Sequence, residues 1–220
     1  MEKEKNVKKD VSEEKTKTNN IDIKESGKAC LNAIKNVFVK PLDAIKEFVT
    51  DNNFISGIIM IVVAALSTGI YKLATLKSAY DQLDNGWFKA PKPEYLKEFF
   101  TTFGTNLLEY ALVALIGYLI ISKLMKGSAT LKQVVSAVGI SLSLVIITYL
   151  VNSILVFIDK EVIVYIMSYL RTFATIYSYM ILYQAVKKIG GIDKNKVFLS
   201  VASMSVCATV VMDILNKLFE

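Results

Sequence analysis

The stretch QVVSAVGISLSLVIITYLVNSILVFI, residues 133–158, runs for 26 residues without a charged side chain. An α-helix rises about 1.5 Å per residue, so about 20 apolar residues cross the roughly 30 Å hydrocarbon core of a bilayer. This stretch therefore predicts a transmembrane helix, and its length and lack of charge are the criteria for finding the other spans.

Four further stretches of the 220-residue chain have the same character, in keeping with a hydrophobic content of 53%. Three of them hold at most one charge. The last is shorter and is interrupted by Asp213, so it crosses only if this carboxylate lies near a membrane interface. We therefore expect an all-α polytopic membrane bundle, with the membrane domain over residues 52–220. The five predicted spans are residues 53–73, 101–122, 134–158, 162–186 and 197–216.

The chain before the first span divides into two parts. Residues 1–26 are mostly Lys, Glu, Asn and Thr, a composition that predicts a disordered cytoplasmic tail. Residues 27–51 place apolar side chains at helical spacing on both sides of Pro41, which predicts a pair of amphipathic helices. Such a pair either lies at the membrane surface or packs against the bundle as a collar, and the sequence leaves both alternatives open.

Lysines set the expected orientation in a multi-pass cell-membrane protein. The loops 123–133 and 187–196 hold three and four lysines, whereas the loop 159–161 holds only one. Short basic loops stay in the cytoplasm. The N-terminus is therefore predicted inside and, with five spans, the C-terminus outside.

Arg171, the only arginine among the 26 basic residues, lies in the middle of the predicted fourth span. Counting along the helices from the outer side places Arg171 and Glu109 at a similar depth of about 10–15 Å, with Asp213 somewhat shallower. Lipid satisfies neither charges nor hydroxyls, so we expect the polar faces to meet. Arg171 is then expected to pair with Glu109, with Asp213 as the second candidate. The supporting polar faces include Thr105, Asn106, Asn152, Ser168, Thr175 and Thr209.

Two interpretations of this charge cluster remain open. In the first, which we favour because opposite charges are available to cancel, it is a buried clasp that decides which helices are neighbours. In the second, it lines a water-filled outer cavity that handles an ion, a proton or an anionic headgroup.

Residue types that catalysis commonly needs are missing from the chain. It has no histidine, which excludes His-based nucleophile pairs and HExxH zinc sites, and it has no GxxxxGK[ST] motif. Its two cysteines lie in different segments and suggest neither a disulfide framework nor a metal site. We therefore expect no enzyme activity, no cofactor, no metal and no nucleic-acid partner.

Two segments resemble the bacterial branch of the YIP-domain family of five-span membrane proteins. NVFVKPLDAIKEFVTDNNFISGIIMIVV, residues 36–63, is similar to the family's amphipathic segment with a lone proline before the first span. GSATLKQVVSAVGISLSLVIITYLV, residues 127–151, is similar to its cytoplasmic loop and third span, with a glycine near Gly139. The Asp-Leu-Tyr-Gly-Pro motif of the eukaryotic members is absent, as is the zinc ribbon of several bacterial relatives.

The resemblance implies a non-enzymatic protein of the lipid bilayer that organises or assembles membranes through helix-mediated contacts. Its partner would be another membrane protein or a second copy of the chain. The charge cluster leaves a different alternative open, a small transporter or permease subunit whose small-molecule substrate the sequence does not name. A third alternative is a lipid-binding or envelope-stress sensor.

Overall fold

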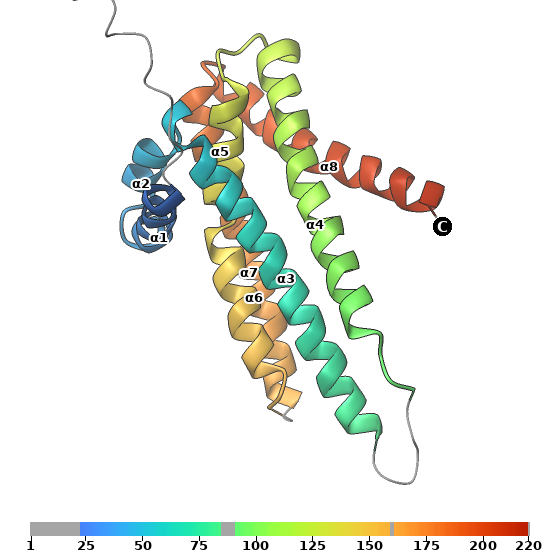
Figure 1. The fold of residues 1–220 in the computed structure, drawn as a ribbon. Helices are drawn as coiled ribbons and strands as arrows, with labels where there is room; N and C mark the ends of the chain where they lie inside the picture. Colours follow the sequence, from blue (N-terminus) through green and yellow to red (C-terminus); the bar gives the residue numbers. More distant parts are fainter. Residues whose placement is uncertain (1–22, 85–90, 159–160, 220) are drawn as a thin grey trace, which may run out of the picture.

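The computed structural model describes residues 23–84, 91–158 and 161–219, and these ranges are α-helical apart from short turns (Figure 1). Most of the predicted tail lies outside the described residues, but α1 already begins at Ile23, before the expected boundary. The elements are α1 (Ile23–Val39), α2 (Pro41–Phe48), η1 (Asp51–Asn53), α3 (Phe54–Leu83), α4 (Tyr95–Tyr118), η2 (Leu119–Leu124), α5 (Leu131–Ser141), α6 (Ser143–Leu155), α7 (Glu161–Ile189) and α8 (Lys194–Phe219).

Four helical segments are long and apolar enough to cross a membrane. They are Asp51–Leu83, Tyr95–Leu124, Leu131–Leu155 and Lys194–Leu215, and they correspond to the predicted first, second, third and fifth spans. Helix α7 has the required length, 29 residues, but Arg171 and many hydroxyl-bearing side chains lower its hydropathy. The described residues thus form a multi-pass membrane protein with four candidate spans, and the crossing of α7 stays a prediction.

Helix α3 lies at the centre of the bundle and packs against α4, α5 and α6, while α7 packs against α5 and α6 (Figure 1). At the crossing of α3 and α5 the two backbones touch. A methyl group built on Gly139 would lie 2.6 Å from the carbonyl oxygen of Gly57, and one on Gly57 would lie 2.8 Å from the Cα of Ser136. Only residues without a side chain allow helices to approach this closely, so both glycines are required for this crossing.

The predicted third span is bent rather than continuous. It divides into α5 and α6 at Leu142, whose N–H donates to the carbonyl of Gly139 at 3.2 Å. The hydroxyls of Ser141 and Ser143 donate to carbonyls three residues earlier, at 2.7 Å each. Such side-chain bonds compete with the helical ladder and bend it. The predicted span over residues 134–158 is present as the candidate span Leu131–Leu155, and the structure adds a bend within it.

Helices α1 and α2 pack against the side of the bundle and form a collar. The Cys30 thiol donates to the carbonyl of Ser56 at 3.3 Å, and the Tyr177 hydroxyl donates to the carbonyl of Val37 at 2.6 Å. The collar also keeps an apolar outer edge, formed by the exposed side chains of Leu31, Phe38, Val39 and Leu42. The two alternatives left open by the sequence are therefore compatible, because one edge of the pair packs inward and the other suits a membrane surface.

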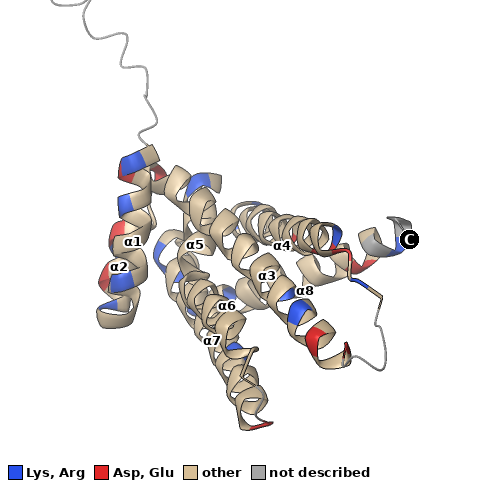
Figure 2. Ribbon diagram, turned by 60° about the horizontal axis from the view of Figure 1, so that its bottom comes forward, with Lys and Arg blue, Asp and Glu red and all other residues tan. Residues whose placement is uncertain are grey.

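The lysine-rich loops lie together at one end of the bundle. The N–H of Ser128, in the loop before α5, donates to the carbonyl of Gly190, in the loop before α8, at 2.9 Å. The collar lies at the same end, because the ammonium of Lys188 donates to the carbonyls of Lys46 and Val49. Figure 2 shows the charges gathered on the collar and near the helix ends, with long uncharged stretches on α3 and α6. This distribution is the one expected of helices that cross a hydrocarbon layer.

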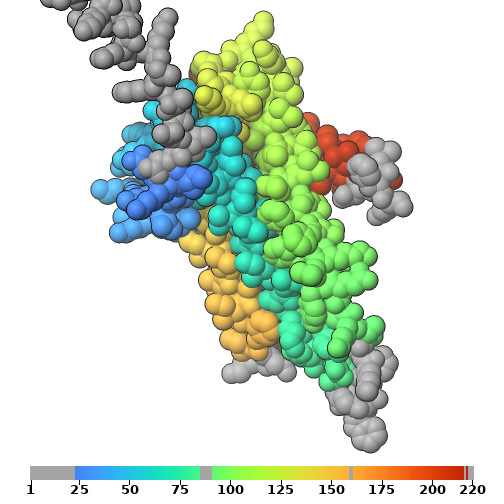
Figure 3. All heavy atoms as spheres, viewed as in Figure 1, coloured from blue at the N-terminus to red at the C-terminus, as the bar shows by residue number. Residues whose placement is uncertain are grey.

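Helix α8 leaves the bundle. It begins beside the other helices, packs against α4 and α7, and then extends away to one side (Figures 1 and 3). One of its faces is buried, with Met204 and Ala208 fully enclosed, and the opposite face is exposed. The buried face continues as far as Met212.

We predict that Gly139→Ala destabilises the protein, because the added methyl group meets the backbone of α3. Overpacking of this kind costs about 1–3 kcal/mol, or several degrees in the melting temperature of a chain of this size. Thermal unfolding in one detergent measures the effect. Gly104→Ala on α4 is the matched control, since a methyl group there meets nothing within 4 Å. Equal melting temperatures for the two variants would contradict the backbone contact.

Candidate functional site

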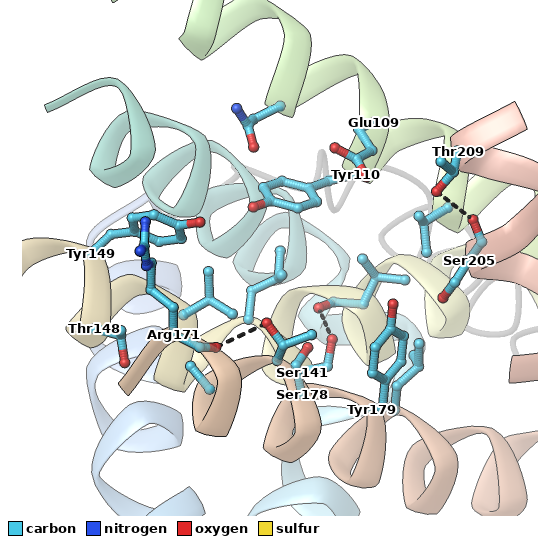
Figure 4. Close-up of a pocket in the computed structure, with 18 residues that line it drawn as sticks. Glu109, Tyr110, Ser141, Thr148, Tyr149, Arg171, Ser178, Tyr179, Ser205 and Thr209 are labelled. Atoms are coloured by element: carbon cyan, nitrogen blue, oxygen red, sulfur yellow. Dashed lines mark hydrogen bonds between the residues drawn. The ribbon is translucent and has the colours of Figure 1, made fainter. Parts of the chain in front are cut away.

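A cavity of about 260 Å³ lies where α4, α5, α6, α7 and α8 approach one another (Figure 4). The bend between α5 and α6 contributes Ser141 and Leu142 to its wall. Hydroxyl, amide and charged side chains from every surrounding helix line it. The polar lining consists of Asn106, Glu109, Tyr110, Ser141, Thr148, Tyr149, Arg171, Thr175, Ser178, Tyr179, Ser205 and Thr209.

Arg171 is held at one wall of this cavity by aromatic residues. Its Nη1 donates to the hydroxyl of Tyr71 on α3 at 3.2 Å, and its Cζ lies 5.7 Å from the centre of the same ring. The ring of Tyr149 on α6 lies 5.4 Å from that of Tyr71, and Figure 4 shows the Arg171 side chain beside Tyr149. A cation within about 6 Å of an aromatic ring is attracted to its negative face. The guanidinium is thus partly satisfied without a carboxylate.

The predicted ion pair is not formed, and this prediction was wrong. Among the residues that the structure describes, Arg171 makes an ion pair with neither Glu109 nor Asp213. Figure 4 shows Arg171 and Glu109 on different sides of the cavity. Counting residues gives the depth of a side chain along its helix but not its direction around the helix axis, and here Arg171 turns toward α3.

Among the residues that the structure describes, Glu109 has no partner of its own. This half-buried carboxylate accepts no hydrogen bond and forms no ion pair within the described part of the chain, yet it lines the cavity. A carboxylate in a low-dielectric interior is costly unless a cation or hydrogen-bond donor meets it. The cavity therefore holds one anionic position that water or a ligand has to satisfy.

The other predicted site residues divide between the cavity and the rest of the bundle. Those that line the cavity are Asn106, Thr175 and Thr209. Asp213 is exposed on α8 and does not line the cavity, whereas its neighbour Met212 is buried. Thr105 and Ser168 do not belong to the cavity wall either.

Asn152 has a different role from the one expected. It is fully buried, and its Nδ2 donates to the carbonyl of Met167 at 3.3 Å, which ties α6 to α7. Its Oδ1 is the one buried side-chain oxygen or nitrogen without a partner in the described ranges. This residue is a helix clasp of the kind predicted for Arg171 and Glu109.

The tyrosines around the cavity were not among the site residues predicted from the sequence. Tyr71, which holds Arg171, stands 100 residues away along the chain. Tyr110, Tyr149 and Tyr179 also line the cavity. No spacing rule could find these residues, because tyrosine is common in membrane helices and the contacts join different helices.

The arrangement is suited to binding rather than to covalent chemistry. In the described ranges no group of three His, Cys, Asp or Glu side chains could hold a metal ion. The cavity offers a guanidinium, a carboxylate and a set of hydroxyls, which are groups that recognise charged and hydrogen-bonding ligands.

A double-mutant cycle on Arg171 and Tyr71 tests the observed contact. We expect Arg171→Gln and Tyr71→Phe each to lower the melting temperature, with a coupling energy of about 1 kcal/mol because both remove one hydrogen bond. Arg171→Gln and Glu109→Gln should instead combine additively, since the two side chains are not paired. Strong coupling between Arg171 and Glu109 would restore the clasp and refute the assignment to Tyr71.

The comparisons with known proteins agree with the architecture. The profile of the Yip1 domain matches residues 35–215, which include α2 to α7 and nearly all of α8. No curated protein and no solved structure matched the chain. Yip1 proteins are non-enzymatic membrane proteins. The match covers all the helices that line the cavity and confirms the resemblance seen in two segments of sequence, so the chain belongs to the Yip1 domain family.

Proposed function

We propose that this Yip1-domain protein organises or assembles membrane components by binding a partner helix along the outer stripe of α8. The outer stripe runs along the face opposite the buried one, at three- and four-residue spacing. It consists of Leu199, Ser203, Cys207, Val210 and Ile214. The observation that carries the proposal is that this apolar stripe lies on a helix that leaves the bundle.

The chemistry of the stripe suits another helix better than it suits lipid alone. Ser203 and Cys207, one turn apart at its centre, are small residues that allow two helix backbones to approach closely. Leu199, Val210 and Ile214, all more than half exposed on α8, supply the van der Waals contacts on either side. Asp213 beside the stripe offers a polar anchor that is costly in lipid and is stabilised by a donor on a partner.

The proposal includes a five-span topology in which α7 crosses the membrane. The basic loops before α5 and α8 and the collar would then face the cytoplasm, and the C-terminus would lie outside. The gathering of these lysine-rich segments at one end of the bundle supports this orientation.

Photo-crosslinking in native membranes tests the partner helix. With a photoreactive residue at Val210, we expect one discrete protein adduct, whereas the same residue at the exposed Ile154 of α6 should give lipid adducts only. Mild oxidation adds a second arm. A disulfide between two Cys207 thiols, lost in Cys207→Ser and kept in Cys30→Ser, would identify the partner as a second copy. Equal lipid labelling from Val210 and Ile154 would contradict the proposal.

A small transporter or permease subunit is the second candidate, and the cavity with its unpaired Glu109 favours it. We predict that Ser178→Cys, in a Cys207→Ser background, reacts with a membrane-impermeant thiol reagent if the cavity is filled with water. Thr172→Cys, exposed on another side of α7, is the matched control and should not react in the membrane. Cys30 will not interfere, because burial raises the pKa of its thiol to about 11 and leaves little reactive thiolate near pH 8. If Ser178→Cys does not react, the cavity is closed to water and the transporter hypothesis is refuted.

A further inference from the structure

A second hollow adjoins the polar cavity. It is a groove of about 610 Å³ between α7 and α8, and its lining is almost entirely apolar. Side chains at its rim, including Met180, Phe198 and Val206, are more than half exposed on the surface of the bundle. In a membrane this groove opens toward the lipid chains, because the helices that form it are flanked by other exposed apolar side chains.

The cavity and the groove share part of their walls. Tyr179 of α7 and Ser205 of α8 line both, and Figure 4 shows them together at the side of the cavity where α8 passes. A polar cavity thus lies directly beside an apolar groove. The ligand that fits such a pair of hollows has a polar head and a hydrocarbon chain.

The two charged side chains of the cavity indicate which polar headgroup it binds. Arg171 presents a guanidinium to the cavity, and Glu109 presents a carboxylate that accepts no hydrogen bond in the described part of the chain. They are not paired with each other, so a ligand with one anionic and one cationic group satisfies both. Phosphate binds a guanidinium in a bidentate manner, and a primary ammonium has the N–H donors that a carboxylate needs.

We propose that the cavity binds the headgroup of a phospholipid that carries both a phosphate and a primary amine, with an acyl chain in the groove between α7 and α8. The phosphate lies toward Arg171 and the ammonium toward Glu109. The hydroxyl of Ser178, also in the lining, is available to one of the remaining phosphate oxygens. Ligand pockets commonly measure about 300–1,000 Å³, so a cavity of about 260 Å³ is of the size for a headgroup and not for a whole lipid.

The same two charged positions predict the relative affinities of three phospholipids. A phosphatidylglycerol headgroup has no cation and leaves the Glu109 carboxylate unpaired beside a second negative charge. A phosphatidylcholine headgroup has the charge but no N–H donor for that carboxylate. Phosphatidylethanolamine satisfies both positions, so it is expected to bind most tightly and phosphatidylglycerol least tightly.

Native mass spectrometry of the purified full-length protein, titrated with dioleoyl forms of these three lipids, tests the proposal. We expect phosphatidylethanolamine to bind about tenfold more tightly than phosphatidylglycerol, because one additional charged hydrogen bond changes the affinity by about this factor. Glu109→Gln should remove most of this preference, and Arg171→Gln should weaken both lipids. Asp213→Asn, which alters an exposed carboxylate outside the cavity, is the matched control and should keep the preference.

Two further measurements keep the outcome interpretable. Val206→Trp, at the exposed rim of the groove, should weaken the long-chain lipids without lowering the melting temperature, and soluble phosphoethanolamine should bind much more weakly than the lipid. Equal binding of all three lipids to the parent protein, or a preference that survives Glu109→Gln, would overturn the proposal. The crosslinking at Val210 does not depend on this site, so the failure of one proposal leaves the other in place.

Discussion

The contact between Gly57 and Gly139 is the constraint on which the rest of the bundle depends. Helix α3 packs against α1, α4, α5 and α6, and α5 reaches it only where both backbones lack side chains. The bend at Leu142 comes within one turn of this crossing. The close contact therefore sets the position from which α6 leaves α5 and from which the cavity wall begins. A helix held at a larger distance could not place Ser141 and Arg171 around the same small space.

Arg171 shows how a bundle accommodates a guanidinium without a carboxylate. The hydrogen bond to Tyr71 and the position of the guanidinium near the aromatic ring provide two favourable interactions in a low-dielectric setting. Because tyrosine carries no charge, this arrangement leaves the site with an unneutralised cation. Glu109 is left equally unneutralised on another side of the cavity. The bundle thus keeps two opposite charges apart, which stabilises a zwitterionic guest more than it stabilises the empty protein.

The sequence predicted the elements of the fold better than it predicted their contacts. Long uncharged stretches located the spans, because the length of a membrane helix follows from the thickness of the bilayer. Pro41 located the break in the amphipathic pair, because proline is tolerated only in the first turn of a helix. The divergence of α8 was not predictable from hydropathy, since a window of apolar residues carries no information on helix direction. Asp213 of this helix is exposed and does not line the cavity, so it does not join the predicted cluster.

Composition and periodicity alone decided that the chain is a helical membrane protein and that its lysines collect in particular loops. These properties follow from local physics: the cost of burying backbone and charge in hydrocarbon, and the rise of a helix. Only the tertiary structure decided that Arg171 meets Tyr71, that Asn152 ties α6 to α7, and that a polar cavity lies beside an apolar groove. Those outcomes depend on how each helix is rotated about its axis and where it crosses its neighbours. Both are determined by packing between residues far apart in the chain, which no local pattern records.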